Sequence, residues 1–236
     1  MKRAFLGLSL LVASLFVLFG CGGGGSDVGG RNPLVRAVTV FPNVQTVNVT
    51  AREANGNEIV IMQGQTFGSR SQIVQFPRNG NYTITFRDAA NNQVLGQGTA
   101  LFEENQAYTI VGFDGANPNN ILLLQNNRLG SAPGVAAVRF VNAGINQPVD
   151  VYYLRENETI AGMQPKFTNV GPGSATAHGG AFVGNGRFVV TAAGTQTIIE
   201  NDVLPLQDGH SYTIVAGNTG QSSQLVLVDE TGTVAQ

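Results

Sequence analysis

A short strand sequence occurs twice in this chain and constrains its fold more than any other feature. Tyr-Thr-Ile-Val stands at residues 108–111 and again at residues 212–215, an offset of 104 residues. A polar turn precedes each copy, and a turn rich in Gly and Asn follows it, leading into a second apolar stretch. Because the same order recurs at one interval, the sequence indicates a duplicated domain.

Short segments of alternating polarity, separated by turn residues, fill the first half of the chain. Residues 46–52 put Val47 and Val49 on one face and the polar side chains on the other. Asn55-Gly56 is a strong hairpin signal. Strands are expected at residues 35–41, 46–52, 58–62, 71–76, 82–86, 94–101, 107–113 and 121–125. The expected inward side chains are Val38, Val47, Val49, Ile73, Tyr82, Ile84, Phe86, Tyr108, Ile110 and Leu123.

The second half repeats this order, with residues 138–139 matching residues 35–36. A turn-rich linker at residues 126–134 separates the halves, and it is short enough that the two domains should touch or stay close. About seven or eight short strands per half are typical of an antiparallel sandwich. The sequence therefore predicts an all-β protein of two tandem immunoglobulin-like antiparallel β-sandwich domains, at residues 34–126 and 135–236.

The first 20 residues have the order of a secretory signal peptide. Lys2 and Arg3 form a basic head, residues 4–19 are almost continuously apolar, and Gly20 is small. The apolar run is short for a transmembrane helix, which needs about 20 residues. We expect residues 1–20 to be a signal helix that is removed from the mature protein.

Cys21 is the only cysteine and directly follows Gly20. This arrangement resembles the lipobox of bacterial lipoproteins, which implies cleavage before Cys21 and acylation, as by palmitate. The alternative is an ordinary secretory signal with an incidental cysteine. Two or three acyl chains would give a stable membrane anchor. The resemblance implies a cell-envelope location, with the outer membrane or cell surface favoured because Gly22 rather than an acidic residue comes next.

Residues 21–33 are rich in glycine and are expected to form a flexible tether behind this anchor. A glycine run can also suggest a phosphate loop, but no strand precedes this one and no helix opening with Lys-Ser or Lys-Thr follows. Lipidation of Cys21 would leave no thiol for a disulfide. The domains must then be stabilised by core burial alone.

The charge of the chain argues against nucleic acid as a partner. Charged residues make up 12% of the chain, and the formal net charge is −2. Without Lys2 and Arg3, 11 basic and 15 acidic side chains remain, a net charge of −4. A nucleic-acid surface requires clustered Lys and Arg. The expected partners are the membrane, through the N-terminal lipid, and an envelope protein or glycan.

Several segments of the second half together resemble the bacterial domain of unknown function 4397 (DUF4397). They are Val-Arg-Phe-Val-Asn-Ala at residues 138–143, Val-Asp-Val-Tyr at residues 149–152 and the strand at residues 212–215. The first repeat matches less well, because Phe41-Pro42 replaces Asn-Ala and Asn48 stands where the family prefers Asp. The resemblance implies tandem β-sandwiches on exported proteins. It implies no established activity and no catalytic residues.

The two histidines were weighed as catalytic or metal-binding groups. His178 lies in a glycine-rich patch at residues 171–180, which we expect to be a loop or edge segment, and His210 lies in a turn. A zinc site needs several convergent ligands. A pair of Ser174 and His178 would need an orienting acid and an oxyanion hole, and neither is evident. We expect no enzyme activity, no cofactor and no metal.

Asp150 and Tyr152 are the side chains considered for a surface binding site. Alternation turns both of them away from the core, because Val149 and Val151 point inward. An exposed Asp beside an exposed Tyr could bind a sugar, although the chain has no tryptophan for stacking. The alternatives for Asp150 are a carboxylate that accepts hydrogen bonds from loop amides, and an edge charge that opposes aggregation.

Three functions remain open at this point. The first is a non-catalytic envelope lipoprotein that displays two β-sandwich domains for interaction or scaffolding. The second is a carbohydrate or cell-wall binding module. The third is an enzyme that uses His178 with Ser174. The sequence favours the first, because it combines a lipobox with a duplication and shows no catalytic cluster.

Overall fold

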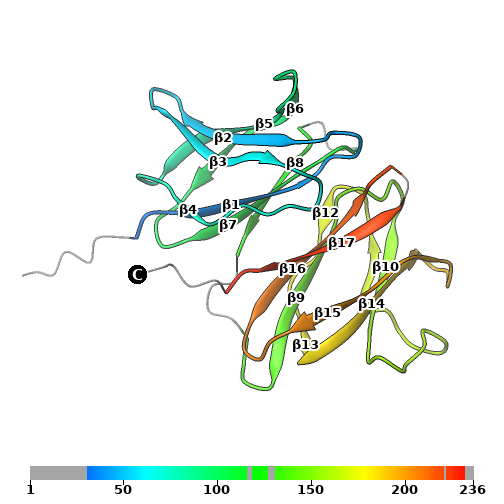
Figure 1. Ribbon diagram of the computed structural model, residues 1–236. Coiled ribbons are helices and arrows are strands. Elements are labelled where there is room, and N and C mark those ends of the chain that lie inside the picture. The colour runs from blue at the N-terminus through cyan, green and yellow to red at the C-terminus, as the bar shows by residue number, and fades with distance from the viewer. Residues whose placement is uncertain (1–30, 116–118, 127–130, 221, 232–236) are drawn as a thin grey trace, which may run out of the picture.

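The computed structural model describes residues 31–115, 119–126, 131–220 and 222–231. The described chain is all-β and forms two sandwiches, one from each repeat (Figure 1). The all-β sandwich class predicted from the sequence is therefore confirmed. The signal segment at residues 1–20 and Cys21 lie outside the described residues.

The first sandwich consists of two four-stranded sheets, with strand orders β4-β1-β7-β8 and β3-β2-β5-β6. Its strands are β1 (Leu34–Val40), β2 (Val47–Glu53), β3 (Glu58–Gln65), β4 (Val74–Gln75), β5 (Gly80–Asp88), β6 (Val94–Phe102), β7 (Ala107–Phe113) and β8 (Ile121–Gln125). Most of these bounds lie within one or two residues of the strands expected from the alternation of polar and apolar residues.

The second sandwich has the same plan, with strand orders β12-β9-β16-β17 and β11-β10-β14-β15, and β13 also pairs with β9. Its strands are β9 (Val135–Asn142), β10 (Val149–Leu154), β11 (Phe167–Val170), β12 (Ser174–Ala175), β13 (Gly179–Phe182), β14 (Gly184–Ala192), β15 (Ile198–Leu206), β16 (Ser211–Asn218) and β17 (Ser223–Asp229). The glycine-rich patch at residues 171–180 contributes β12 and the start of β13, so it is an edge segment, as expected.

The repeated Tyr-Thr-Ile-Val strand occupies the same place in both sandwiches. In the first repeat Tyr108 of β7 pairs with Val35 of β1, and in the second Tyr212 of β16 pairs with Val138 of β9. Both pairings are parallel, whereas the sequence predicted antiparallel sheets throughout. Strands far apart in sequence are not joined by a hairpin, so they are free to pair in parallel.

Each sandwich has its own apolar core between its two sheets. Val47, Val49, Tyr82, Ile84 and Phe86 are buried in the first core, as expected. Val38 is also buried, but it packs in a different cluster, outside this core.

The expected strand at residues 71–76 is only partly formed. Only Val74 and Gln75 form β4, paired with the start of β1. Ahead of β4 the chain follows β1 irregularly, with the Ser71 amide donating to Ala37 O at 2.9 Å. Ile73 is consequently half-exposed, where a buried side chain was expected.

The last part of the predicted tether is held against the first sandwich. The Phe76 amide donates to Pro33 O at 2.9 Å, and the amide of Asn105 donates to Arg31 O at 2.6 Å. Residues 31–33, at the end of the predicted tether, are thus hydrogen-bonded to the first repeat through the carbonyls of Arg31 and Pro33.

Candidate functional site: the interface between the repeats

An apolar cluster that belongs to neither sandwich core joins the two repeats. The facing sheets are β4-β1-β7-β8 and β12-β9-β16-β17, which lie side by side in Figure 1. The cluster consists of Val38, Val40, Val111, Phe113 and Leu124 from the first repeat and Val141, Ala143, Val215, Val226 and Val228 from the second. Every residue of β1 and β7 is buried, because one face of each strand covers its own core and the other covers the partner repeat.

The two repeats use equivalent faces for this contact. Val38 pairs with Val111 within the first repeat, and Val141 pairs with Val215 within the second, at corresponding positions of the parallel strands. All four side chains lie in the shared cluster. The contact therefore resembles an isologous dimer interface, in which one patch meets its own copy across a two-fold axis.

The segment between β3 and β4 of the first repeat also contacts the second repeat. Phe67 packs against the shared cluster, and a guanidinium nitrogen of Arg70 donates to Leu227 O. Gly217 makes room for this contact: a Cβ there would lie 2.7 Å from Phe67 and 2.9 Å from Val40. Its counterpart in the first repeat is Phe113, so the two-fold symmetry is broken at this position.

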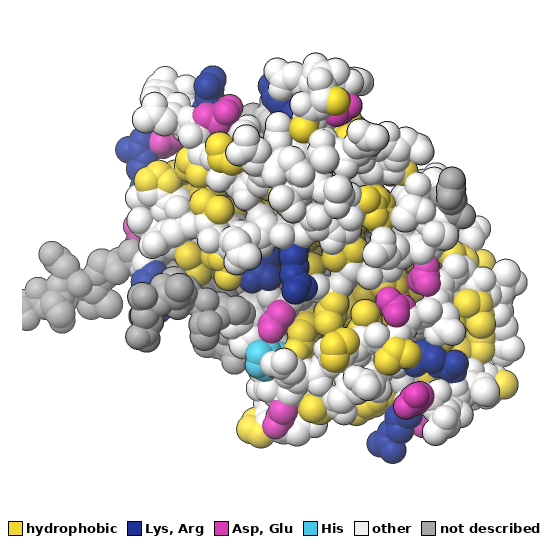
Figure 2. Space-filling model, in the orientation of Figure 1, with side chains coloured by type: hydrophobic (Ala, Val, Ile, Leu, Met, Phe, Trp, Pro, Cys, Tyr) yellow, Lys and Arg dark blue, Asp and Glu magenta, His cyan; other side chains and the backbone are white. Residues whose placement is uncertain are grey.

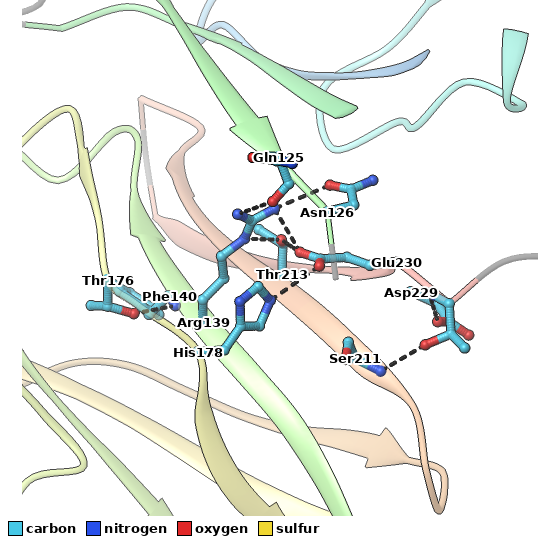
Figure 3. Close-up of polar contacts among 11 residues, drawn as sticks. Gln125, Asn126, Arg139, Phe140, Thr176, His178, Ser211, Thr213, Asp229 and Glu230 are labelled. Carbon is cyan, nitrogen blue, oxygen red and sulfur yellow. Dashed lines mark hydrogen bonds and ion pairs between the residues drawn. The ribbon is translucent and has the colours of Figure 1, made fainter. Parts of the chain in front are cut away.

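A buried polar cluster lies at the end of the interface where β1 and β9 begin (Figure 3). Arg139 of β9 donates from Nη1 to Gln125 O at 2.8 Å and from Nη2 to Asn126 Oδ1 at 3.1 Å, which are both first-repeat groups. Its Nε donates to Thr213 Oγ1 at 2.7 Å. One guanidinium thus joins both repeats through hydrogen bonds.

Glu230 provides the negative charge of this cluster. Its side chain has no exposed surface, and its carboxylate lies 2.7 Å from Arg139 Nη2 and 3.0 Å from His178 Nε2. It also accepts a hydrogen bond from the Thr213 hydroxyl. Burial lowers the pKa of Arg139, and Glu230 partly opposes that shift. Such a pair is stable only when hydrogen bonds satisfy the remaining polar atoms, as they do here.

The first repeat contributes the equivalent arginine but no acid. Arg36 occupies the position of Arg139 and is buried, and its Nε has no hydrogen-bond partner. Burial lowers the pKa of Arg36, the nearby Arg70 adds to the shift, and Asp229 and Glu230 oppose it. Asn126 stands where the second repeat has Glu230, so the first repeat has an amide in the place of the carboxylate that pairs with Arg139.

The suggested pair of Ser174 and His178 is not formed. Ser174 Oγ donates to Gly171 O at 2.6 Å, while His178 contacts Glu230. The other histidine, His210, lies 2.8 Å from Asp229 in a partly exposed pair. Within the described ranges, no three His, Cys, Asp or Glu side chains gather closely enough to hold a metal ion.

The expectation that Asp150 and Tyr152 are exposed is wrong. Both point away from the core of the second sandwich, but they are only 7% and 6% exposed. Asp150 accepts hydrogen bonds from the amides of Asn169, at 2.7 Å, and Gly194, at 2.8 Å. Tyr152 packs with Ile160, which belongs to the long segment between β10 and β11. That segment covers the outer face of the sheet, and alternation along one strand gives no sign of such a cover.

A polar cleft of about 330 Å³ lies at the other end of the interface, where β1, β7, β9 and β16 end. Both repeats line it: Asn43 and Asp114 come from the first, and Asn146 and Asn218 from the second. Asn43 and Asn146 occupy equivalent places after β1 and β9, and Asp114 and Asn218 occupy equivalent places at the ends of β7 and β16. We call it the Asn cleft.

A model of the family described as a domain of unknown function (DUF4397) matches residues 33–152, which is just over half of the chain. The chain belongs to the DUF4397 family. The resemblance seen in the sequence is thus confirmed, although it was drawn mainly from the second repeat. The family match covers the whole first DUF4397 sandwich and only β9 and most of β10 of the second.

No curated protein matches this DUF4397 chain. Among solved structures, it is similar to the crystal structure of a family CBM26 module from Eubacterium rectale Amy13K in complex with maltoheptaose. The identity is 8%, the TM-score is 0.28, and the match covers 85% of this chain and 97% of that chain. A TM-score this low shows neither a shared fold nor a shared function. No helix in the described part of the chain is long and apolar enough to cross a membrane.

The sequence contains a signal for the buried arginines. Arg36 and Arg139 stand at the same position of the two repeats, each within an apolar strand segment. An arginine between apolar neighbours on a strand lies either on an exposed face or on a buried face where its charge has a partner. Its recurrence in both repeats pointed to a shared, buried face. Glu230, in contrast, gave no comparable signal.

Proposed function

We propose that this protein is a non-catalytic lipoprotein of the cell envelope that displays its two sandwiches as one rigid body for interaction or scaffolding. The interface between the repeats carries the proposal. Its apolar cluster and the buried pair of Arg139 and Glu230 join the two domains, so they would move together. Inter-domain contacts within one chain otherwise permit relative motion unless they are large and apolar.

Anchoring through Cys21 is the second part of the proposal. The supporting observations are the basic head, the apolar run and the small residue that precede Cys21 in the sequence. Arg31 and Pro33 are hydrogen-bonded to the first sandwich. Roughly ten residues therefore separate the acylated cysteine from the folded body, which would hold it close to the membrane surface.

Metabolic labelling with an alkyne analogue of palmitate tests the anchor in cells that express the full chain. We expect the label on the wild-type protein and in the membrane fraction, and neither for Cys21→Ser. Incorporation of label into Cys21→Ser, or release of the unlabelled wild type into the soluble fraction, would contradict this part of the proposal. Ser26→Ala is the matched control, because it changes a nearby residue of the tether without removing the thiol.

The proposed lack of catalysis rests on the hydrogen-bond partners of His178 and Ser174. His178 is hydrogen-bonded to Glu230, and Ser174 donates to Gly171 O, so these two side chains do not bond to each other. Steady hydrolysis of an ester or peptide substrate that is lost in His178→Ala would overturn this part of the proposal.

A carbohydrate or cell-wall binding module is the second function considered. Its sequence-based site is lost, because Asp150 and Tyr152 are buried. The Asn cleft is the observation that favours it, since amide side chains from both repeats line an open polar cavity. Glycan binding and rigid display are compatible, because the cleft exists only while the two repeats stay together.

A further inference from the structure

Hydrogen bonds within the second repeat hold one wall of the Asn cleft. On the second-repeat side, the amides of Ala143 and Gly144 both donate to Ala216 O, at 2.9 and 3.0 Å. Asn218 Oδ1 accepts from the amide of Gly220 at 2.8 Å. A Cβ on Gly144 would lie 2.5 Å from the amide nitrogen of Asn218, so only glycine allows these two loops to approach. The wall is therefore preformed by backbone contacts.

Several polar side chains of the cleft have no hydrogen-bond partner in the part of the chain that the structure describes. Among the described residues, nothing is hydrogen-bonded to the side chains of Asn43, Asp114 or Asn146, and all three are exposed. Asn43 has a φ of 61°, a left-handed conformation that Asn tolerates and that fixes where its amide projects. These groups are therefore free to bind a ligand without breaking existing hydrogen bonds.

The chemistry of these groups selects the class of ligand. An amide both donates and accepts, and a carboxylate accepts, so the set matches hydroxyl groups, which also do both. No lysine or arginine is among the described residues that line the cleft, so these residues offer an anionic ligand no opposite charge. We propose that the Asn cleft binds a neutral, hydroxyl-rich glycan unit, at a site built jointly by the two repeats.

The size of the cleft separates this proposal from a metal site. A calcium ion is held by six to eight oxygen atoms at about 2.3–2.6 Å and needs several carboxylates to bind tightly. The cleft has one carboxylate, Asp114, and about 330 Å³ of space, which lies at the lower end of small-molecule pockets at roughly 300–1,000 Å³. One or two sugar rings suit that space better than an ion does.

The position of the cleft suits a protein anchored at its N-terminus. The chain leads into the fold at Leu34, the start of β1, while the cleft lies beyond the other end of that strand. Seven residues of strand span about 20 Å, so the site would face away from the anchor. This step rests on the proposed lipid anchor, whereas the binding chemistry does not.

Figure 2 shows few charged side chains on the face that it draws. Backbone and uncharged polar side chains, in white, cover the largest part of that face, with hydrophobic areas between them and charged side chains in small groups. Among the described residues that line the cleft, Pro42 is the one with an apolar ring and none is aromatic, so these residues offer no aromatic ring for stacking. Affinity would then come from hydrogen bonds alone, and we expect a dissociation constant on the order of 1 mM.

Saturation-transfer NMR of the purified full-length protein in detergent tests the proposal. The probes are maltose, cellobiose, lactose and N,N′-diacetylchitobiose, each at about ten times the expected dissociation constant. We expect transfer to at least one disaccharide, and a loss of affinity of about tenfold or more in the combined variant Asn43→Gly and Asn146→Ala. Glycine at residue 43 removes the amide and keeps the left-handed backbone, so the fold is not strained.

Asn92→Gly is the matched control, because Asn92 is exposed in a turn with a φ of 63° and does not line the cleft. It should leave binding unchanged. Circular dichroism checks that each variant stays folded, and single variants replace the combined one if it does not. The proposal is overturned if no disaccharide shows transfer, or if the cleft variants bind as well as Asn92→Gly does. The proposal is also overturned if calcium chloride raises the melting temperature of the wild type while no sugar binds. That result would indicate a cation site. Labelling at Cys21 is measured separately, so failure here leaves the anchor proposal standing.

Discussion

Glu230→Gln removes the only carboxylate that pairs with Arg139 among the described residues and keeps the shape of the side chain. The Arg139 side chain is 7% exposed, so its charge stays buried after the substitution. Removing one partner of a buried ion pair costs about 3–5 kcal/mol. Three neutral acceptors remain around the guanidinium, namely Thr213 Oγ1, Gln125 O and Asn126 Oδ1. We therefore expect the lower end of that range, about 3 kcal/mol of unfolding free energy.

Urea unfolding of the full-length protein at pH 7, followed by circular dichroism, measures this loss. With a slope of about 2 kcal/mol per molar urea, the midpoint should fall by about 1.5 M. Glu104→Gln is the control, because Glu104 is exposed in a turn and its loss should change stability by less than about 0.5 kcal/mol. If Glu230→Gln behaves like Glu104→Gln, the buried pair does not hold the repeats together.

Three further outcomes are expected. Gly186→Ala should destabilise the protein by about 1–3 kcal/mol, because a Cβ there would overlap the ring of Tyr153. Gly180→Ala should leave stability unchanged, because there is open space around its Cβ. Thermal unfolding measures both variants. Asp150→Ala should cost about 1–3 kcal/mol in urea unfolding, because two backbone amides lose their acceptor, and an unchanged midpoint would contradict their burial. Burial raises the pKa of the Tyr153 hydroxyl, so the unfolded chain loses this proton at a lower pH than the folded protein does, and stability falls as pH rises above about 10. Tyr153→Phe should reduce that fall by at most about 1.4 kcal/mol per pH unit. A pH profile of stability identical to that of the wild type would refute the argument.

The strands and the duplication could be predicted from the sequence because both are local properties. Alternation placed Val47, Val49, Tyr82 and Ile84 correctly, since a strand has two faces and only one meets its core. Val38 shows where that reasoning stops. Val38 lies on an apolar, buried face of its strand, but that face packs against the other repeat. The pattern along a single strand does not distinguish a face that covers its own core from one that covers another domain.

The candidate sites could be predicted less well, because they depend on contacts between distant segments. Asp150 and Tyr152 have the orientation expected of them, yet Tyr152 packs with Ile160, and Asp150 accepts hydrogen bonds from the amides of Asn169 and Gly194. Glu230 is 91 residues from Arg139 in sequence and lies next to it in the fold. The Asn cleft exists only where the loops of the two repeats meet, so no single stretch of sequence contains it.

The distance between the two outer sheets tests the central claim, that the two repeats form one rigid body. Spin labels at Asn81→Cys in β5 and Asn201→Cys in β15, in a chain that also carries Cys21→Ser, would sit on exposed strand positions of different repeats. We expect double electron–electron resonance to give one narrow distance peak that broadens in Glu230→Gln. A broad or multiple distribution in the otherwise unchanged protein would contradict the account.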